Sequence, residues 1–378
     1  MTHPDPSARP EGAVLVLNAG SSSFKARLLA SDDGVLWQGS TGWDATGGSQ
    51  GPDVAQVLGE WLVPALEPWR ESIALAGHRV VHGGERFTAP TRLTPEVLAE
   101  LEALVPLAPL HNGPGLQVMR HLAAVWPELP QWACFDTAFH ATLPAAARTY
   151  ALPEDWRALG LRRFGFHGLN HQHVAETVRR RFGVTRPDTG RGEGPLRLIS
   201  CHLGAGCSLC AIAGGRSIAT TMGFTPLEGL VMARRSGSLD PGLLLHLLRL
   251  GVAPAELDRV LNGESGLLGL SGLSGDMREL RAAEASGHPG AALALAVFQF
   301  SLLQAIGAMA ASLGGVDVIA LTGGIGEHDE TLRGALVESL AWLGPCELIV
   351  VPADEEGQIA RSCRAATSCS PQACPPPP

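Results

Sequence analysis

Val14-Leu-Val-Leu-Asn-Ala-Gly-Ser-Ser-Ser-Phe-Lys-Ala-Arg-Leu-Leu29 and Leu198-Ile-Ser-Cys-His-Leu-Gly-Ala-Gly-Cys-Ser-Leu-Cys-Ala-Ile212 share one design. Each runs from an apolar strand through a turn of small residues into a second apolar strand. Such turns leave backbone N–H groups uncovered, and converging N–H groups form an anion nest that suits phosphate oxygens. One nest in each half of the chain predicts a duplicated fold that binds a polyphosphate.

The overall composition limits the class of protein. The chain has 378 residues, enough for two domains, and a formal net charge of −9. This acidic balance and the lack of a dense Lys/Arg run argue against nucleic-acid binding. The only lysine is Lys25, inside the first nest, either a chance survivor or a phosphate contact. The polar, Pro-rich start has no apolar signal core, so we expect a cytoplasmic protein.

The stretch 291–316 carries no charged residue and is long enough to suggest a membrane span. Two glutamines and two serines interrupt it, and it runs into a Gly-Gly turn, so we interpret it as a buried helix.

The eight cysteines lack paired zinc-type spacing. Cys201, Cys207 and Cys210 fall on the second hairpin, where strand alternation scatters them, and we expect structural thiols.

Strands and helices alternate along the chain, which predicts the α/β class. A β-meander over 14–40 precedes a helix over 53–75, a strand over 73–81 and a helix over 94–104 that begins with Thr94-Pro95. A helix over 114–126 and a strand over 131–136 follow. In the second half we expect a helix from residue 170 to 182, the second hairpin, helices to residue 313, and strands over 316–321 and 347–351.

Six polar residues are candidates for chemistry. Arg79 and Arg235 adjoin glycines at strand or loop ends, where a guanidinium binds carboxylate or phosphate bidentately unless it is simply solvated. His167, in Phe164-Gly-Phe-His-Gly168, is either a packed core residue or a donor to an anionic transition state. Asp136 ends a strand, where its carboxylate orients a nucleophile, holds a metal-bound water or caps a helix. Asn18 and Glu355 carry oxygens that suit Mg²⁺.

Eight segments, found in order between roughly residues 13 and 360, together resemble the acetate kinase family. These are Asn18-Ala-Gly-Ser-Ser-Ser23, Gly77-His-Arg-Val-Val-His-Gly-Gly-Glu85, Pro106-Leu-Ala-Pro-Leu-His-Asn112, Phe135-Asp-Thr-Ala-Phe-His140, Arg163-Phe-Gly-Phe-His-Gly168, Phe224-Thr-Pro-Leu-Glu-Gly-Leu-Val-Met232, Glu264-Ser-Gly-Leu-Leu-Gly269 and Thr322-Gly-Gly-Ile-Gly-Glu327.

The resemblance implies a duplicated ribonuclease-H-like fold of the actin, Hsp70 and sugar kinase type, with the active site in the interdomain cleft. We therefore expect an N-terminal domain over 13–148, a nucleotide-binding C-terminal domain over 149–360 and a disordered tail over 361–378. The implied activity is that of an ATP:carboxylate phosphotransferase, which moves the γ-phosphoryl of ATP to acetate and gives acetyl phosphate and ADP. The implied metal is Mg²⁺, with Mn²⁺ as the alternative, and the implied assembly is a homodimer without nucleic-acid or membrane partners.

The resemblance also assigns roles. Arg79 and Arg235 would hold the carboxylate and the moving phosphoryl group, His167 and Arg235 would stabilise the transition state, and Asp136 would position the reactants. Asn18 and Glu355 would support the metal. The acyl pocket would comprise Val81, Leu110, Phe166 and Pro226. His111 would line the phosphate path, and the nucleotide would contact Ser21, Ser23, Lys25, His202, Leu203, Gly204, Ala205, Gly206, Asp276, Met277, Arg278, Gly324, Ile325 and Gly326.

Several positions depart from the family pattern. Ala205 stands where the family usually has Asn, Leu169-Asn170 replaces Thr-Ser, and Ser238 replaces an acidic residue. The segment 344–348 is short, and 362–378 is rich in Cys and Pro where a returning helix is expected. These departures keep open a catalytically weakened nucleotide-binding protein of the same fold. A propionate kinase is the second alternative, because one methylene in an apolar pocket changes binding by only about 1–3 kcal/mol.

Overall fold

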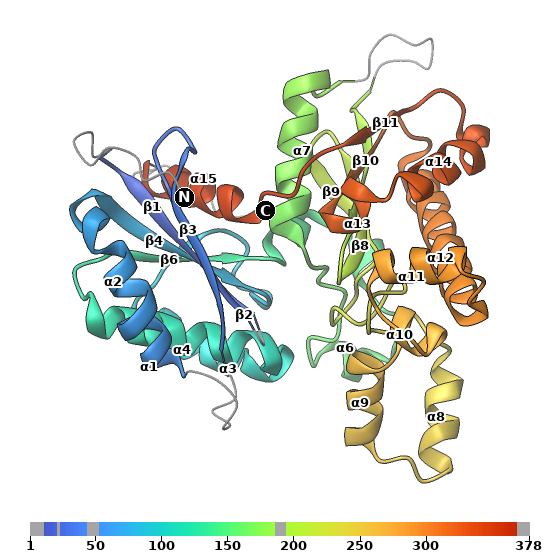
Figure 1. Ribbon diagram of the computed structural model, residues 1–378, viewed down its shortest axis with the longest axis horizontal. Helices are drawn as coiled ribbons and strands as arrows, with labels where there is room; N and C mark the ends of the chain where they lie inside the picture. Colours follow the sequence, from blue (N-terminus) through green and yellow to red (C-terminus); the bar gives the residue numbers. More distant parts are fainter. Residues whose placement is uncertain (1–10, 21–22, 44–52, 186–193, 369–378) are drawn as a thin grey trace. The chain divides into compact units, whose positions relative to one another are not determined.

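The computed structural model describes residues 11–20, 23–43, 53–185 and 194–368 (Figure 1). Contacts divide the chain into two units, which are described separately. Unit 1 comprises residues 1–138 and 354–378, and unit 2 comprises residues 139–353. We expected the division after residue 148. The segment 139–148 belongs instead to unit 2, because His140 Nδ1 and Thr142 Oγ1 lie 2.9 and 2.8 Å from the hydroxyl and carbonyl oxygens of Ser217.

Unit 1 contains a six-stranded sheet in the order β3-β2-β1-β4-β6-β5. The strands β1 (Ala13–Ala19), β2 (Ser23–Leu29) and β3 (Val35–Gly42) form the expected antiparallel meander. The strands β4 (Ile73–Val80) and β6 (Gln131–Phe135) run parallel to β1, and the short β5 (Thr91–Arg92) pairs antiparallel with β6. The parallel strands β1, β4 and β6 therefore end at one edge of the sheet.

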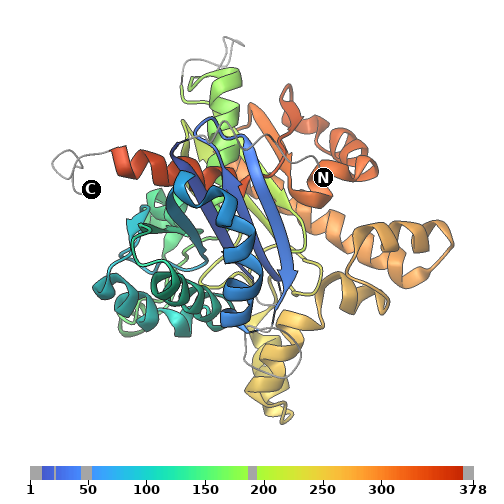
Figure 2. The same cartoon turned by 60° about the vertical axis from the view of Figure 1, so that its left-hand side comes forward.

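One face of this sheet packs on helices. The helical run 54–72 comprises α1 (Val54–Gln56), a π-helical segment, α2 (Val63–Leu66) and a 3₁₀ segment. It buries Val57, Leu58 and Leu62 against β1 and β2. The helix α4 (Pro109–Val125) covers the same face of the sheet (Figure 2). The helix α3 (Pro95–Ala103) begins as predicted, since the Thr94 side chain caps it and Pro95 occupies its first position. The helix α4 begins before the expected residue 114 and contains Pro114.

The other face of the unit 1 sheet contacts α15 (Glu355–Ser368), which packs on β1, β4 and β6. The expectation of a disordered tail over 361–378 is wrong for residues 361–368, and residues 369–378 lie outside the described part of the chain. This helix buries Ile359, Ala360 and Cys363. Its contact face consists mostly of small residues, which allow a close approach to the sheet but give no bulky apolar stripe in the sequence. We missed the helix for that reason.

Unit 2 contains a five-stranded sheet in the order β11-β10-β7-β8-β9. Its strands are β7 (Arg197–Leu203), β8 (Cys207–Ala213), β9 (Arg216–Thr220), β10 (Val318–Thr322) and β11 (Glu347–Val350). An antiparallel meander β9-β8-β7 is followed by two parallel strands, as β3-β2-β1 is followed by β4 and β6 in unit 1. This repeated topology confirms the predicted duplicated α/β fold, and β11 completes the sheet after the short 344–346 connection.

Helices cover the unit 2 sheet. The helix α7 (Gly168–Phe182) packs Val174 and Val178 on β7, β8 and β10, and α12 (Pro289–Leu313) contacts β7, β8 and β9. The remaining elements are α5 (Ala145–Arg148), α6 (Glu154–Arg157), α8 (Pro241–Arg249), α9 (Pro254–Gly263), α10 (Gly266–Ser271), α11 (Met277–Ala285), α13 (Gly323–His328) and α14 (Glu330–Ser339), with 3₁₀ turns at 105–107, 138–142 and 341–343.

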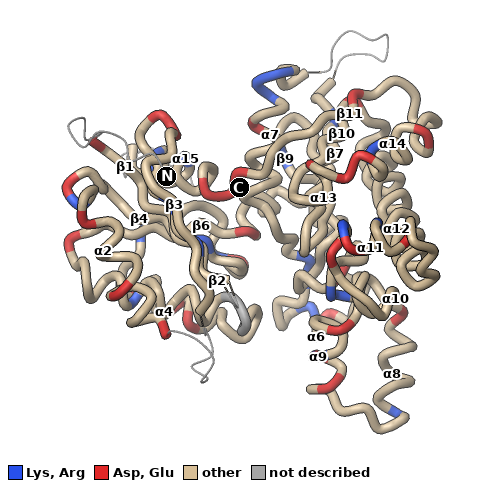
Figure 3. The backbone as a smooth tube through the Cα atoms, viewed as in Figure 1, with Lys and Arg blue, Asp and Glu red and all other residues tan. Residues whose placement is uncertain are grey.

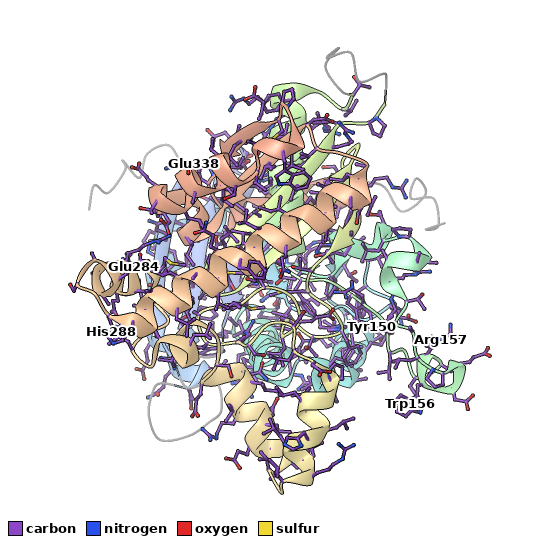
Figure 4. All side chains as sticks on the ribbon, turned by 90° about the vertical axis from the view of Figure 1, so that its right-hand side faces the viewer. Tyr150, Trp156, Arg157, Glu284, His288 and Glu338 are labelled. Carbon is purple, nitrogen blue, oxygen red and sulfur yellow. The ribbon has the colours of Figure 1, made fainter. Side chains whose placement is uncertain are left out.

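The helix α12 corresponds to the uncharged stretch and is tan throughout in Figure 3. Among the described residues it is the one helix long and apolar enough to cross a membrane by length and composition. It nevertheless packs as a core helix along one side, where it buries Phe298, Leu302 and Ile306. Figure 4 looks onto this helix, with His288, whose side chain caps it, at its start. Its outer side leaves Leu293 and Phe300 exposed, so burial is less complete than we expected.

Candidate functional site

Strand alternation places three candidate side chains on one face of unit 1. In β1, Ala13, Leu15 and Leu17 enter the helix-covered core, so Asn18 belongs to the opposite set. Arg79 in β4 is in register with Cys134 of β6, and Asp136 directly follows β6. These positions share the edge where the parallel strands end. The helix α15 begins there with Glu355 and Glu356, since Asn18 Nδ2 lies 3.3 Å from Glu356 Oε1.

Arg79 and Asp136 form a nearly bidentate ion pair. Arg79 Nη2 lies 2.6 Å from Asp136 Oδ2, and Nε lies 3.2 Å from each carboxylate oxygen. Asp136 is buried, whereas Arg79 retains 22% of its side-chain exposure. Burial by itself lowers the pKa of Arg79, but the charges of Asp136, Glu355 and Glu356 outweigh burial and raise it above its ordinary value. Arg79 is therefore a fixed cation whose remaining N–H groups can reach a ligand.

Asn18 joins this pair to the start of α15. Arg79 Nη1 donates to Asn18 Oδ1 at 3.4 Å, and Asn18 Nδ2 donates to Glu356 Oε1 at 3.3 Å. Burial raises the pKa of Glu355, Arg79 opposes this shift, and Glu356 and Asp136 add to it. One guanidinium thus faces three carboxylates, which leaves excess negative charge in a partly buried place. We call Asn18, Arg79, Asp136, Glu355 and Glu356 the carboxylate cluster.

The carboxylate cluster fits a hard divalent cation by its donor chemistry, since carboxylate and amide oxygens suit Mg²⁺. Among the described residues, no group of three or more His, Cys, Asp or Glu side chains is arranged to hold a metal ion without other ligands. This is compatible with Mg²⁺, which usually keeps several waters and binds through one or two carboxylates plus phosphate oxygens. Asn18 and Glu355, which the sequence analysis assigned to the metal, are both in the cluster, and Glu356 is a member that it did not assign.

The start of α15 is held in place by Asp354. The Asp354 carboxylate accepts from the backbone N of Gly357 at 3.1 Å and from Arg361 Nη1 at 3.1 Å. Arg27 Nη1 on β2 lies 3.4 Å from the same carboxylate. Arg361 also pairs with Asp33, beyond β2. These contacts fix the helical turn that carries Glu355 and Glu356.

The first nest is only partly described. Ser21 lies outside the described residues, and Ser23 and Lys25 are exposed on β2. The turn is closed by a hydrogen bond from Gly20 N to Ser23 O at 2.9 Å. A groove of about 330 Å³ adjoins Lys25, and its lining consists of Lys25, Ala26, Arg27, Gln38, Gly39, Ser40 and Glu356. Lys25 therefore borders the carboxylate cluster on the same unit.

In unit 2, His167 and Arg235 approach the second nest. A Cβ placed on Gly206 would lie 3.2 Å from His167 Nε2 and 3.9 Å from Arg235 Nη1. Only glycine leaves this space open. His167 has a left-handed backbone, with φ at 56°, and Arg235 O accepts from Met232 N at 3.2 Å. A left-handed non-glycine residue is strained, and such strain concentrates at functional sites. We call Gly204, Ala205, Gly206, His167 and Arg235 the glycine-turn cluster.

Other predicted nucleotide contacts surround this turn. His202 and Leu203 end β7 and are buried, and the ring of His202 stacks on that of His167 with centroids 4.3 Å apart. A Cβ on Gly204 would lie 3.9 Å from Gly324 N. Gly324, Ile325 and Gly326 lie in the first turns of α13. The structure therefore brings β7, the Gly204–Gly206 turn and the start of α13 together.

The predicted adenosine contacts lie at the start of α11. Asp276 caps this helix through Arg278 N at 2.8 Å and pairs with the Arg278 side chain. These hydrogen bonds lower the pKa of Asp276 to about 2. Met277 is buried, whereas the Arg278 side chain is 90% exposed. Arg278 is thus a surface residue held by its neighbour.

The predicted acyl-pocket residues are divided between the units. Val81 follows β4 in unit 1 and is partly buried. Phe166 is fully buried and Pro226 partly buried in unit 2. Leu110 and His111 fall outside the side chains that the structure describes. Each described residue has the apolar character that the prediction requires.

Sequence reasoning missed a group of buried polar residues behind His167. His140, His171, Asn170, Ser200 and Ser208 are all buried and hydrogen-bonded to one another or to their neighbours. A spacing signal was available, because His171 lies in the first turn of α7, four residues after His167, which precedes that helix. The serines alternate on β7 and β8 with apolar residues and gave no separate signal.

Comparison with known proteins identifies relatives over most of the chain. A model of the acetokinase family matches residues 49–363. A protein named acetate kinase from Synechococcus sp. (strain JA-2-3B'a(2-13)) is 42% identical over an alignment of 402 positions, and the alignment covers 93% of this chain and 98% of that protein.

Solved structures agree with this result. An acetate kinase from Porphyromonas gingivalis is 33% identical, with a TM-score of 0.84 over 94% of this chain and 100% of that one. A propionate kinase from Francisella tularensis subsp. tularensis SCHU S4 is also 33% identical, with a TM-score of 0.85 over 93% of this chain and 99% of that one. The likeness therefore extends over both units.

Proposed function

Because this chain belongs to the acetokinase family, we propose that it is an acetate kinase, an ATP:carboxylate phosphotransferase. It would transfer the γ-phosphoryl group of ATP reversibly to acetate and give acetyl phosphate and ADP. The observation that carries this proposal is the carboxylate cluster, in which a fixed guanidinium and excess carboxylate charge lie at one edge of a sheet. Such a cluster can serve both an anionic substrate and the divalent cation that accompanies ATP.

Phosphoryl transfer requires positioning and charge stabilisation more than covalent chemistry by the protein. In this proposal Arg79 binds the acetate carboxylate and Asp136 keeps the guanidinium in one orientation. Arg235 and His167 donate to the equatorial oxygens of the moving phosphoryl group, where charge spreads in the transition state. Acetate is already ionised near neutral pH, so its oxygen attacks without a general base.

Asn18 and Glu355 are the proposed metal-supporting residues, with Glu356 beside them. Mg²⁺, or Mn²⁺ in its place, would neutralise phosphate charge when bound with the nucleotide. The residues of this chain contribute by holding that charge in place. Asn18 bridges Arg79 and Glu356, and Asp354 anchors the turn on which both glutamates lie.

The nucleotide would be held mainly by unit 2. We propose phosphate contacts from the Gly204–Gly206 turn and His202, with Ser21, Ser23 and Lys25 as further candidates in unit 1. Adenosine would contact the start of α13 through Gly324, Ile325 and Gly326, and the start of α11 through Asp276, Met277 and Arg278. Val81, Leu110, Phe166 and Pro226 remain the proposed acyl pocket. One methylene there changes binding by only about 1–3 kcal/mol, so propionate is the natural competing substrate.

We also propose that the enzyme works as a cytoplasmic homodimer, with no nucleic-acid or membrane partner. Exposed leucines on and beside α8 support self-association, since Leu243, Leu245 and Leu250 are 45, 52 and 68% exposed. Exposed apolar patches often mark protein interfaces. Light scattering after size-exclusion chromatography of the parent and of Leu245→Glu tests this. A dimeric parent and a more dissociated variant are expected, and a monomeric parent contradicts the proposal.

The activity is tested by trapping acetyl phosphate with hydroxylamine after incubation with acetate, ATP and Mg²⁺. We expect the hydroxamate to form with acetate in preference to propionate, and to disappear when EDTA is added. Propionate preferred over acetate would indicate the propionate kinase alternative. Nucleotide binding without hydroxamate from either acid would indicate the catalytically weakened alternative.

A further inference from the structure

A chain of hydrogen bonds runs behind His167 in unit 2. Ser200 Oγ lies 2.9 Å from His171 Nδ1, His171 Nε2 lies 2.9 Å from Ser208 Oγ, and Ser208 Oγ lies 2.8 Å from His167 Nδ1. Ser200, Ser208 and His171 are completely buried. The chain therefore links the ring of His167 to the protein interior on the side opposite Nε2.

His171 determines the direction of these hydrogen bonds. Burial lowers its pKa well below the usual value, and the neighbouring imidazoles His140 and His202 lower it further, so His171 is neutral near neutral pH. A neutral imidazole has one N–H and one bare nitrogen. One serine must therefore donate to His171 while the other accepts from it. Because Ser208 has a single hydrogen, it can donate to only one of the two rings, and accepting from both would leave that buried hydrogen without a hydrogen-bond partner. Its bond to His167 therefore follows the same direction.

Two orders are compatible with these distances. In the first, Ser200 donates to His171, His171 donates from Nε2 to Ser208, and Ser208 donates to Nδ1 of His167. A neutral His167 then carries its hydrogen on Nε2. In the second order every bond is reversed, so His167 donates from Nδ1. Its Nε2 is then bare unless the ring becomes a cation.

The surroundings of His167 favour the first order. Its Nε2 and the Arg235 guanidinium approach the same point beside Gly206. A cationic His167 would add a second positive charge there, and a bare Nε2 would repel anionic oxygens. His202, whose ring stacks on that of His167, is the same tautomer. The Asn170 amide nitrogen donates to His202 Nδ1 at 2.8 Å, so a neutral His202 carries its hydrogen on Nε2.

We propose that Ser200, His171 and Ser208 are positioning residues that hold His167 as the neutral tautomer with its hydrogen on Nε2, ready to donate to an anionic oxygen. The identity of that oxygen, on the transferring phosphoryl group, rests on the proposed function. The tautomer itself does not, and it can be measured in the protein without substrate. No proton is transferred in this arrangement, because the chain only fixes which nitrogen donates.

The cluster contains a matched control. Ser217 Oγ lies 2.9 Å from His140 Nδ1, and both side chains are buried like Ser208 and His171. Ser217→Ala removes a comparable buried hydrogen bond without interrupting the chain to His167. A purely structural role for these hydroxyls predicts that Ser208→Ala and Ser217→Ala behave alike.

The direct test is ¹⁵N NMR of the full-length protein labelled at histidine, with His167 assigned by its loss in His167→Gln. Near neutral pH, we expect His167 in the parent to show a protonated Nε2 and a bare Nδ1. Ser208→Ala should give His167 a mixture of tautomers, and Ser217→Ala should leave its signals unchanged. A parent His167 protonated on Nδ1 would overturn the proposal, even if no serine variant folds.

Kinetics provide the second readout. We expect Ser208→Ala to lower kcat on the order of tenfold with little change in the KM for ATP. Ser217→Ala should retain kcat despite a similar loss of melting temperature, and Ser208→Thr, which restores a hydroxyl, should recover part of the rate. Equal kcat losses in Ser208→Ala and Ser217→Ala would also overturn the proposal. A parent with the predicted tautomer but no kinase activity would instead count against the proposed function alone.

Discussion

Arg79 Nη2 lies 2.6 Å from Asp136 Oδ2, and this ion pair joins the ends of two parallel strands, β4 and β6. Asp136 is completely buried, so its charge depends on the guanidinium for compensation. Arg79 is in turn partly exposed and keeps N–H groups for a ligand. The pair therefore connects the fold of unit 1 to its proposed chemistry.

Replacing Arg79 should remove activity while leaving nucleotide binding intact. We expect Arg79→Ala to lower kcat at least about 10²–10³-fold, because the guanidinium faces charge in the transition state. Arg79→Lys keeps the charge but loses the planar set of N–H donors of the guanidinium, so its kcat should also be low. Steady-state kinetics and ATP titration below the melting temperature measure both effects. Arg120→Ala, which removes an exposed pair with Glu102, is the control. Near-parental turnover in Arg79→Ala would exclude the assigned role.

Glu355 should control the metal requirement. Glu355→Gln removes a carboxylate from the carboxylate cluster, and we expect the Mg²⁺ concentration for half-maximal activity to rise roughly 10–100-fold. Saturating Mg²⁺ should recover much of the rate. Titration of activity with Mg²⁺ checks this, with Glu102→Gln as the exposed control. An unchanged titration would move the role to Glu356, which contacts Asn18.

The packing of α15 can be tested through Gly77. A Cβ there would lie 2.7 Å from Ile359 Cγ2 and 2.9 Å from Cys363 Sγ. Gly77→Ala should therefore destabilise the protein by about 1–3 kcal/mol, and a smaller residue at 359 should relieve part of this loss. Denaturant unfolding measures it. The control is Gly42→Ala on β3, where a Cβ meets nothing within 4 Å. Equal effects at both glycines would mean that α15 does not pack as described.

His78 should make stability fall at acid pH. Burial lowers the pKa of His78 to about 4, and the hydrogen bond to Gln131 offsets this only partly. As pH falls below about 6.5, the unfolded chain binds a proton that the folded protein resists. Stability should thus be complete above that pH and decline toward pH 4, by up to roughly 3 kcal/mol from this residue. Between pH 6.5 and pH 4, the unfolding free energy of His78→Gln should depend less on pH than that of the parent. His121→Gln, at an exposed site, should follow the parent, and identical parent and His78→Gln slopes would contradict the assignment.

Much of the fold could be predicted because its signals are local. The two hairpins, the strand that ends just before Asp136 and the Thr94 cap depend on short patterns that the structure reproduces. The helix α15 could not be predicted from such local patterns. Its buried face consists mostly of small residues, with Ile359 and Cys363 beside Gly77, and such a face has no wide hydrophobic stripe.

The candidate site was predictable to a similar extent. Arg79, Asp136 and Asn18 are placed together by strand register, and Glu355 arrives beside them from the other end of the chain. Glu355 was assigned from the family resemblance, with Glu356 as the next candidate, because two adjacent glutamates give no other sequence reason to prefer one. The chain behind His167 was missed because buried serines look like ordinary strand residues, and only their distances to His171 reveal it.

Phosphoryl transfer to the carboxylate oxygen of acetate is the central claim, and ³¹P NMR with ¹⁸O-labelled acetate tests it most directly. In the presence of ATP and Mg²⁺, the account predicts an acetyl phosphate signal with the isotope shift of a bridging ¹⁸O, formed in step with ADP. Arg79→Ala should show neither product above background. ADP formed together with unlabelled inorganic phosphate, and no acetyl phosphate signal, would contradict the account.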